Sequence, residues 1–493
     1  MDKYEYAVFL SLANFSPVAE LHLAHIINLQ KISNKSSILG IICDGKFGGC
    51  SINPTGLPAT CYFCRLRATR ICNISGIKYI YLSEFKPKDI TYTPNSLFLG
   101  AMSSVASHTR AESISDLSCI WKFILKRLHI ASIKTYKSIK EIIRIYDIKE
   151  LYIFNGRYSC GKAAKEAARN SGIDFSVYDV RQQYRPYINK NIDLHNAHEA
   201  IKRANLLFYK NPEQSTKVAI KYFNDRRNQK STFETSYTDK QQLGFYGKLN
   251  KSKQLIVIYT SSDDEYRFLG NDWGISQRKV LQSKEIFKLI TNLPSEDFEI
   301  VIRIHPNQIG VRTSSLQSIR SLPKRDNVTV HDPDSVIDSY ALLDKADAVI
   351  TFASSISLEA SYWKKLLIQI GPSPYSPLNI GYNFNSAIDC IDFLKANNRK
   401  LNKIKILDSK NAIIFANYLM SYFDPLDGFE RVDGIYKVHS ITLPVSRLSR
   451  ILSIPEKLII YITKRPNVFS KHFIRKILIT IEDIIQGTFR DII

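Results

Sequence analysis

The chain has few of the features that mark secreted, membrane-spanning or repetitive proteins. Its N-terminus, MDKYEYAVFLSLANF, has no basic segment followed by a long apolar core, so we expect no signal peptide. It has no run of about 18 uninterrupted apolar residues, and we therefore expect no transmembrane helix. We find no internal repeat at a solenoid period and no low-complexity tract. These absences predict a globular protein of the cytoplasm.

Cysteine and acidic residues are also scarce. Eight cysteines among 493 residues do not suggest a disulfide framework, and in the cytoplasm they would stay reduced. The 46 Asp and Glu residues are outnumbered by 68 Lys and Arg, which gives a formal net charge of +22. This excess indicates anionic partners, such as nucleotide phosphates, acidic lipid headgroups or an anionic polymer. We expect no nucleic acid, because nothing resembles a zinc finger, a basic zipper or an RNP-like strand.

Length and apolar content together predict two packed domains with extensions. The hydrophobic content is 44%, and apolar strands alternate with helices along the chain. This pattern is typical of α/β proteins with doubly wound, parallel, Rossmann-like sheets. We place one such domain at residues 1–228, a polar linker at 229–253, a second domain at 254–400, and C-terminal helices with a basic tail at 401–493.

Residues 340–375 organise the second domain. They are predicted to form a helix, a buried strand, a short polar turn, a helix and another strand. Ser354 and Ser355 fall where the second helix begins, and Glu359 lies one turn further on. A helix N-terminus presents free N–H groups and a partial positive charge, so it suits an anion. A nearby carboxylate can hold the hydroxyls of a sugar. An ordinary βαβ unit with a serine N-cap fits the same residues.

Two further strands of this domain also end in polar residues. Residues 298–304 (FEIVIRI) include Arg303 and end at His305 and Asn307, whereas residues 254–259 are followed by Ser261 and Ser262. Ligands of open α/β sheets bind at the carboxyl ends of the strands. We therefore predict that these side chains line one cleft for a phosphorylated ligand. A hydrogen-bonded histidine at a strand end is the alternative for His305.

Four cysteines of the first domain form a second pattern. Cys43, Cys50, Cys61 and Cys64 follow the spacing C-x6-C-x10-C-x2-C. The last pair has the spacing of a metal knuckle, and four thiolates can hold zinc tetrahedrally. A structural metal site, with zinc or an iron–sulfur cluster, and free thiols both fit the sequence. A metal here would staple the loop at residues 44–60, and we assign it no part in catalysis.

Several motifs resemble those of bacterial capsule and surface-polysaccharide biosynthesis proteins. They are the HPN after a strand, the TSSDDE loop, and VITFASSISLEA followed by LLIQIGPSPY. FNGR at residues 154–157 and the cysteine-containing segment near residue 50 are also similar to that family. These proteins look like GT-B glycosyltransferases of the Kdo-transferase and CDP-glycerol-transferase groups. The resemblance is patchy, but it touches both halves of the chain.

The resemblance implies a fold, an activity and a division of roles. It implies two Rossmann-like domains facing a cleft, which transfer a sugar from a nucleotide-sugar donor to a polysaccharide or lipid-linked glycan without a catalytic cofactor. His305 would donate to a phosphate oxygen and so stabilise the leaving nucleotide. The predicted donor contacts are Ser261, Ser262, Arg303, His305, Asn307, Ser354, Ser355 and Glu359, with Glu359 on the ribose.

The acceptor would lie on the first domain. Glu20 begins the first helix, and the resemblance implies that it is the base for the acceptor hydroxyl, which predicts inversion, with retention as the alternative. Glu20 can also merely complement the helix dipole. Asn155 and Arg157 follow the strand at residues 150–154, where Arg157 can pair with a phosphate or simply be solvated. His25 is a further acceptor contact, or else a polar residue on a solvated face.

Two other functions fit the same residues. One is phosphoglycerol or phosphosugar transfer onto a cell-surface polymer, and the other is a non-catalytic, metal-stapled scaffold of polysaccharide or nucleic-acid assembly. From residue 445 onward, Ile and Leu alternate with Lys and Arg, and a second such run spans residues 473–485. Basic amphipathic helices of this kind can lie on an anionic membrane, here the inner face of the plasma membrane, or pack on the protein.

Overall fold

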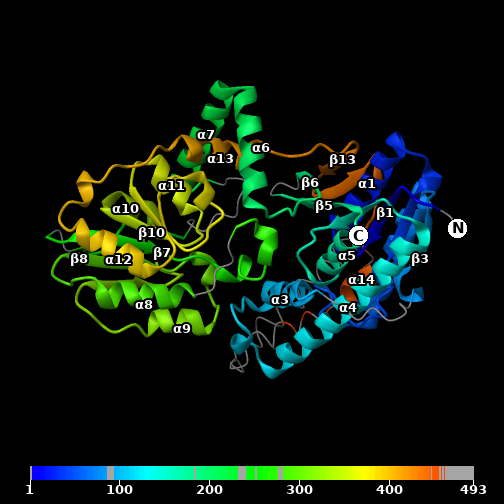
Figure 1. Cartoon of the computed structure of the whole chain (residues 1–493), viewed down its shortest axis with the longest axis horizontal. Coiled ribbons are helices and arrows are strands. Elements are labelled where there is room, and N and C mark those ends of the chain that lie inside the picture. Colours follow the sequence, from blue (N-terminus) through cyan, green and yellow to red (C-terminus); the bar gives the residue numbers. More distant parts are fainter. Residues whose placement is uncertain are drawn as a thin grey trace, which may run out of the picture. The chain divides into compact units, whose positions relative to one another are not determined.

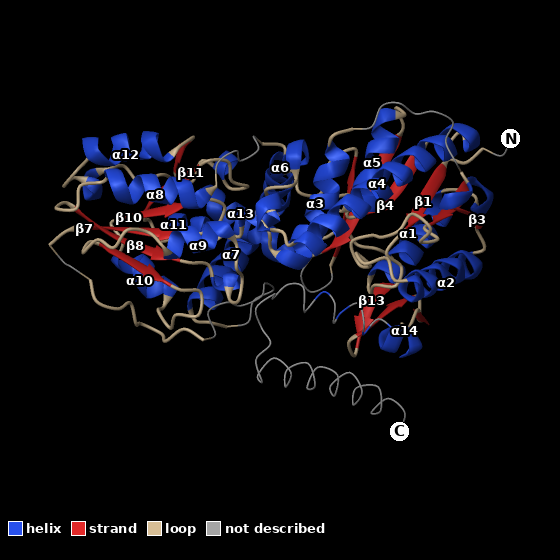
Figure 2. Cartoon of the chain, turned by 90° about the horizontal axis from the view of Figure 1, so that it is seen from below, coloured by secondary structure: helices blue, strands red, loops and turns tan. Residues whose placement is uncertain are grey.

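The chain divides into two compact units. The computed structural model describes residues 3–85, 94–181, 185–230, 240–249, 252–275, 281–445 and 447–452, with residues 454, 457 and 460. Unit 1 comprises Met1–Leu194 and Phe423–Ile493, and unit 2 comprises His195–Tyr422. Each unit has its own six-stranded sheet with helices packed against it (Figures 1 and 2).

The sheet of unit 1 has the strand order β3-β2-β1-β4-β5-β6. All neighbours run parallel except β5 and β6, which are antiparallel. This order is that of a Rossmann fold, whose topological switch point lies between the first and fourth strands. The strands are β1 (Tyr6–Leu10), β2 (Ile38–Ile42), β3 (Lys78–Tyr81), β4 (Glu150–Phe154), β5 (Asp174–Val180) and β6 (Pro186–Lys190).

Helices cover this sheet, and the strand sequences reflect that. Strand β2 (ILGII) is buried at every residue, as a continuous apolar run between two covered faces should be. The first helix is buried over most of its length, because α2 and two later strands pack on it. The helices are α1 (Val18–Ile32), α2 (Pro58–Ser75), α3 (Ser96–Thr109), α4 (Cys119–Tyr146) and α5 (Ser159–Asn170).

The chain returns to unit 1 after residue 422 and adds a small antiparallel sheet. Its strands are β13 (Phe429–Val432), β14 (Ile435–Val438) and β15 (Ile441–Thr442). Val438 and Leu443 join the core formed by α1, α2 and the main sheet. This region differs from the C-terminal helices expected at residues 401–493. Asp433 and Gly434 both have positive φ, and Asp-Gly between alternating residues is a hairpin signal.

The sheet of unit 2 repeats the Rossmann order, with β12-β11-β10-β7-β8-β9 and every pair parallel. Alternate residues of β7 enter the cores on its two faces: Leu255 and Val257 on one, Ile256 and Ile258 on the other. The strands are β7 (Gln254–Tyr259), β8 (Phe298–Arg303), β9 (Val328–His331), β10 (Ala348–Thr351), β11 (Leu366–Ile370) and β12 (Tyr382–Phe384).

The helices of unit 2 begin earlier in the chain than expected. Tyr222 and Phe223 lie in the core of unit 2 beside Leu255 and Phe415, so the segment before residue 228 packs with the second sheet rather than the first. The helices are α6 (Ala197–Lys210), α7 (Pro212–Arg227), α8 (Gln282–Asn292), α9 (Ser314–Arg320), α10 (Ser339–Lys345), α11 (Ile356–Tyr362), α12 (Ala387–Ala396) and α13 (Lys410–Ser421) (Figure 1).

The basic tail lies mostly outside the described residues. Of the two predicted amphipathic runs, the structure describes α14 (Arg447–Leu452) and residues 454, 457 and 460. Helix α14 packs against α2, and the Ser449 hydroxyl accepts a hydrogen bond from Asn14 at 2.9 Å. In the described part of the chain, no helix has the length and apolar character needed to cross a bilayer.

Candidate functional site

The predicted donor residues come together at one edge of the unit 2 sheet. Strand β7 lies between β10 and β8, and all three run parallel. The polar residues that follow them therefore share the carboxyl edge of the sheet, around the switch point between β7 and β10. Ser261 follows β7, His305 follows β8, and Ser354 follows β10. The predicted grouping of these three strand ends is present in the structure.

His305 is held in a defined orientation. Its backbone N–H donates to the Thr260 hydroxyl at 2.9 Å, and its Nδ1 accepts the backbone N–H of Asn307 at 3.1 Å. Because Nδ1 acts as an acceptor, the proton of the neutral imidazole must sit on Nε2. The half-buried side chain thus presents an N–H donor from a fixed ring. The predicted contact of His305 with a phosphate oxygen would use this N–H.

Other residues of the loops after β7 and β8 form hydrogen bonds with one another. Asn307 Nδ2 donates to Ser262 Oγ at 3.3 Å and to Glu265 Oε1 at 3.1 Å, and Gln308 also donates to Ser262 at 3.1 Å. The Ser261 hydroxyl donates to Asp263 at 2.9 Å. Ser261 and Ser262 are both buried. The Ser262 hydroxyl links the loop after β7 to the loop after β8, whereas the Ser261 hydroxyl stabilises the loop after β7 from within.

Glu359 lies behind this edge rather than in it. Its carboxylate is fully buried, forms an ion pair with Arg226 of α7, and accepts a hydrogen bond from the Tyr340 hydroxyl at 3.4 Å. Arg226 also donates to the half-buried Ser355 hydroxyl at 3.4 Å. This placement favours a role for Glu359 in positioning Arg226 and Ser355 over direct contact with a ribose.

The helix after Ser354 and Ser355 is shorter than the anion-site prediction assumed. Helix α11 has seven residues, and the Ser355 side chain makes no capping hydrogen bond. The partial positive charge at its N-terminus therefore contributes little to anion binding. The polar groups at this turn are the hydroxyls of Ser354 and Ser355 and the guanidinium of Arg226 from α7. Arg303 is also engaged elsewhere, since its buried guanidinium donates to the Asp332 carbonyl at 2.5 Å and the Ser335 carbonyl at 3.3 Å.

Unit 1 places a second polar group at the carboxyl edge of its own sheet. After β4, Asn155 and Gly156 both have positive φ, and a side chain at Gly156 would meet Val177 at 2.8 Å. The turn therefore needs glycine at this position. Asn155 accepts the backbone N–H of Arg157 at 3.1 Å and donates to the carboxylate of Asp179 near the end of β5. The carboxylate of Asp179 thus lies beside the predicted pair Asn155 and Arg157, although the sequence analysis did not identify it.

The carboxyl of Asp179 has a raised pKa. Burial raises the pKa of this carboxyl to about 6, although the Asn155 amide, the Val180 N–H and the Arg157 charge act in the opposite direction. Groups with a perturbed pKa at a strand-end edge are candidates for proton transfer. No motif surrounds Asp179 in the sequence, so only the strand order of the structure identifies it.

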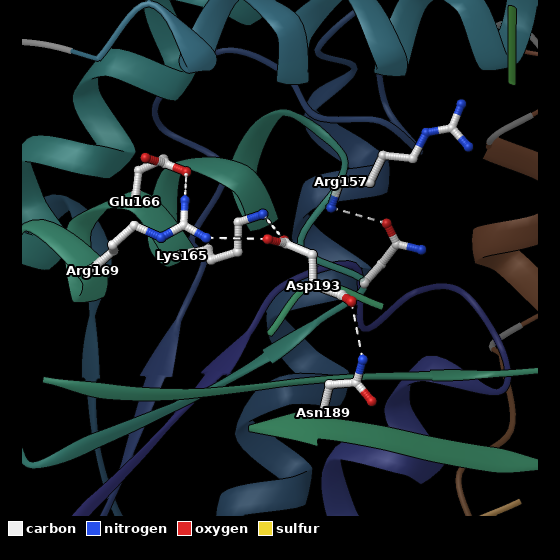
Figure 3. A network of polar contacts seen from close by, with 7 residues as sticks. Arg157, Lys165, Glu166, Arg169, Asn189 and Asp193 are labelled. Atoms are coloured by element: carbon white, nitrogen blue, oxygen red, sulfur yellow. Dashed lines mark hydrogen bonds and ion pairs between the residues drawn. The ribbon is translucent and has the colours of Figure 1, made fainter. Parts of the chain in front are cut away.

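An ionic network lies on α5, the helix that follows this turn (Figure 3). The fully buried Lys165 of α5 forms an ion pair with Asp193, and Arg169 bridges Asp193 at 3.1 Å and Glu166 at 2.6 Å. Asn189 donates to the Asp193 carbonyl at 3.0 Å. The side chain of Arg157 points away from this group, so the network anchors α5 while Arg157 extends from the turn (Figure 3).

Glu20, the predicted base, is buried and paired. Arg67 of α2 donates to its carboxylate at 3.0 Å, and Ser16 donates to it at 3.1 Å. Arg67 also donates to the carbonyls of Ala13, at 2.7 Å, and Leu443. Burial raises the pKa of Glu20, and the Arg67 charge opposes that rise. The pair joins α1, α2 and the returning segment, which favours a structural role for Glu20.

His25 is buried rather than solvated. Its ring packs 4.0 Å from that of Tyr178, and burial, followed by His22, lowers the pKa of His25 to about 3. It lines a cavity of about 280 Å³ together with Tyr152 and Tyr187. This volume is close to the lower limit of ligand pockets, about 300 Å³. Because Tyr152 lies in the middle of β4, the cavity is over the face of the sheet and not at its carboxyl edge.

The four predicted cysteines also converge, and a fifth joins them. Cys43, Cys50, Cys61 and Cys64 line one cavity of about 20 Å³, and Cys160 of α5 lines it as well. All five are free thiols. Among the residues that the structure describes, no three His, Cys, Asp or Glu side chains are grouped so that they could hold a metal ion. The thiols thus share one cavity, which Ser11, Asn53 and Thr60 also line.

Comparisons with known proteins return similar folds. No family model matches the chain, and no curated protein matches it. Similar solved structures include KpsC of Thermosulfurimonas dismutans, a beta Kdo 2,4 transferase, with 14% identity, a TM-score of 0.37, and coverage of 55% of this chain and 79% of that one. A putative UDP-N-acetylglucosamine 2-epimerase from Listeria monocytogenes has 12% identity and a TM-score of 0.26 over 93% of this chain and 97% of that one.

The wall teichoic acid polymerase TagF is also similar, with 13% identity, a TM-score of 0.23, and coverage of 59% of this chain and 57% of that one. These likenesses concern the fold, and at these scores the assignment of two Rossmann-like sheets rests on the strand orders themselves. Kdo transferases are one of the groups whose motifs the sequence resembles.

Proposed function

We propose that this chain is a glycosyltransferase that moves a sugar from a nucleotide-sugar donor to a bacterial surface glycan. One observation carries the proposal. The oriented His305, with its fixed Nε2 proton, stands at the same sheet edge as the polar turns after β7 and β10. A nucleoside diphosphate bound at that edge would accept hydrogen bonds from His305 and the two turns, since ligands of such sheets bind at the switch point.

The chemistry then divides between donor activation and proton removal. As the bond between the anomeric carbon and the phosphate oxygen breaks, negative charge develops on the leaving nucleotide. The Nε2–H of His305 and the Arg226 guanidinium, which Glu359 orients, would stabilise that charge. These donors are protein groups, so we propose that transfer requires no metal ion.

The acceptor hydroxyl must lose its proton as its oxygen bonds to the anomeric carbon. A carboxylate supplies that base, and we infer that Asp179 fills the role better than Glu20. Asp179 is half-buried at the carboxyl edge of unit 1, whereas Glu20 is buried against Arg67. In-line attack assisted by one carboxylate predicts inversion at the sugar.

Nucleotide binding tests the donor site directly. Purified protein is titrated with CMP, CDP, UDP, GDP and dTDP by calorimetry and thermal shift, in parallel with His305→Ala. One nucleotide should raise the melting temperature of the wild type, because a ligand of the folded state stabilises it by mass action. Losing a hydrogen bond to a charged group costs about 1.5–3 kcal/mol, so the variant should bind roughly 10- to 150-fold more weakly.

A matched variant separates the site from general effects. His198 lies exposed on α6 of the same unit, and His198→Ala should bind the nucleotide as the wild type does. Equal affinity of His305→Ala and wild type would remove His305 from the donor site. If no nucleotide shifts the wild type, the glycosyltransferase proposal fails and a non-catalytic scaffold becomes the better reading.

A further inference from the structure

Five cysteines of unit 1 are brought to one place by four separate segments. Cys43 directly follows β2, and Cys50 lies in the turn closed by hydrogen bonds with Asn53. Cys61 and Cys64 are three residues apart in the first turns of α2, and so they share one face of that helix. Cys160 is in the first turn of α5, beyond the end of β4. All five line the same cavity.

The thiols are largely shielded from water. Cys64 and Cys160 are buried, and Cys43, Cys50 and Cys61 are half-buried. A metal centre that binds clustered thiols replaces their protons.

Donor groups are already aimed at the sulfurs. The Asn53 amide donates to Cys61 Sγ at 3.1 Å. The backbone N–H of Gly45 is directed at Cys43, and the Ser11 hydroxyl and the Gly161 N–H are directed at Cys160. Donors directed at cysteine sulfur stabilise thiolates and tune metal centres, particularly iron–sulfur clusters. These donors would therefore stabilise thiolates bound to a metal centre.

The size of the cavity distinguishes between occupants. A single zinc ion would hold its sulfurs at about 2.3 Å from one central point, which leaves no space for a water molecule among them. The cavity that the sulfurs line has a volume of about 20 Å³. Such a volume admits a water molecule, for which roughly 10–15 Å³ suffices. The site therefore has room for an occupant larger than one metal ion.

We propose that Cys43, Cys50, Cys61, Cys64 and Cys160 provide the ligands of an iron–sulfur cluster, with Cys160 as the member that the sequence spacing does not reveal. A cluster of iron and sulfide ions fills a wider ring of thiolates than zinc does, and four cysteines complete its coordination. Its role is structural, because it links the loop at residues 44–57 to α2 and α5. This proposal is independent of the glycosyltransferase proposal.

The loop at residues 44–57 contains several glycines in the left-handed region, and hydrogen bonds to Arg127 hold part of it in place. Gly45, Gly48, Gly49 and Gly56 all have positive φ. Arg127 of α4 holds the carbonyls of Thr55, at 2.9 Å, and Gly48, at 2.7 Å, so one side of the loop is fixed by hydrogen bonds. Cys43 precedes this loop, Cys50 lies within it and Cys61 follows it, so the cluster would fix it at three further points.

Metal content and spectroscopy test the proposal on the full chain. The protein is purified without oxygen, incubated with ferrous iron, sulfide and a thiol reductant, and desalted. Iron, acid-labile sulfide and zinc are then quantified, together with visible absorption and the electron paramagnetic resonance of the reduced sample. We expect iron and sulfide in equal amounts and a broad visible band. The double variant Cys50→Ser, Cys160→Ser leaves three thiols and should lose most of this iron.

The control changes two cysteines outside the cavity, with Cys119→Ser and Cys390→Ala, and should match the wild type. Zinc without iron in the wild type would overturn the cluster, and so would the absence of bound metal after reconstitution. Full iron in the Cys50 and Cys160 double variant would also overturn it. If that variant fails to fold, as circular dichroism would show, alkylation decides: the five thiols should be protected in reconstituted wild type and reactive after chelation, and equal reactivity refutes the proposal.

Discussion

The Glu20–Arg67 pair provides the sharpest test of whether the predicted base is structural. Glu20 is 2% exposed and Arg67 is 7% exposed, so both charges are removed from water. Arg67 also satisfies two backbone carbonyls, of Ala13 and Leu443. The perturbation is therefore asymmetric. Arg67→Met leaves a buried carboxylate without its cation, whereas Glu20→Gln leaves Arg67 with both carbonyl acceptors.

The magnitudes follow from this asymmetry. Removing one member of a buried ion pair costs about 3–5 kcal/mol, because the remaining charge is uncompensated. We expect Arg67→Met to lie in that range. Glu20→Gln keeps its neighbours hydrogen-bonded and should cost about 1–3 kcal/mol. The double variant should be more stable than the sum of the two predicts, with a coupling energy of about 1–3 kcal/mol, as is usual for residues in contact.

Urea unfolding at pH 7, followed by hydrogen exchange of peptides from α1 and α2, measures these values within unit 1. Arg70→Met, at an exposed position of α2, is the matched control and should change stability by about 0.5 kcal/mol or less. If Arg67→Met is as stable as this control, the structural reading fails. If Glu20→Gln abolishes sugar transfer at unchanged stability, Glu20 is the base after all.

Two further predictions concern pH. Unfolded His25 binds a proton below about pH 6.5, but folded His25, with its pKa of about 3, does not, so stability falls as the pH falls through that window. Between pH 6 and pH 5, the free energy of unfolding of His25→Phe should therefore fall by about 1 kcal/mol less than that of the wild type, as measured by urea titrations. For Asp179, whose pKa is about 6, the transfer rate should rise with pH through that value as the carboxyl ionises. Asp179→Asn should lower the rate by about 10²–10⁴-fold and remove this pH dependence in an assay with the nucleotide identified by binding.

Each of these has a clear contrary result. Parallel stability curves for His25→Phe and wild type would mean that His25 titrates alike in the folded and unfolded chain. An unchanged pH profile in Asp179→Asn would exclude Asp179 as the base and return that role to another carboxylate.

The buried strands were predictable because their sequences are continuous apolar runs. Residues 254–259 form a strand with the bounds expected from the sequence, and the two strands predicted within residues 340–375 are β10 and β11. In a parallel sheet covered on both faces, such a run has few other ways to be buried. Once the strands are known, the positions of the polar residues directly after them are known as well. This is why the grouping of Ser261, His305 and Ser354 could be predicted.

Partners distant in sequence could not be predicted in the same way. Arg67 meets Glu20 across 47 positions, and Arg226 meets Glu359 across 133. Which side chains meet depends on how helices pack, and no local pattern specifies it. His25 illustrates the same limit: a helical period suggested a solvated face, but its ring packs on Tyr178 of β5 and Tyr152 of β4. The strands β13 and β14, which also pack on α1, did carry a local signal, the Asp-Gly turn between them.

Unit 1 consists of two segments of the chain that are separated by unit 2, and this has a consequence for synthesis on the ribosome. Domains fold as units and N-terminal ones generally first, as the chain emerges. Here the segment that supplies Val438 and Leu443 to unit 1 is translated only after the whole of unit 2. Unit 2 is continuous and can complete its core while unit 1 still lacks these residues. The N-terminal half of this protein is therefore expected to reach its native state last, with α1 and α2 open to chaperones until the final strands arrive.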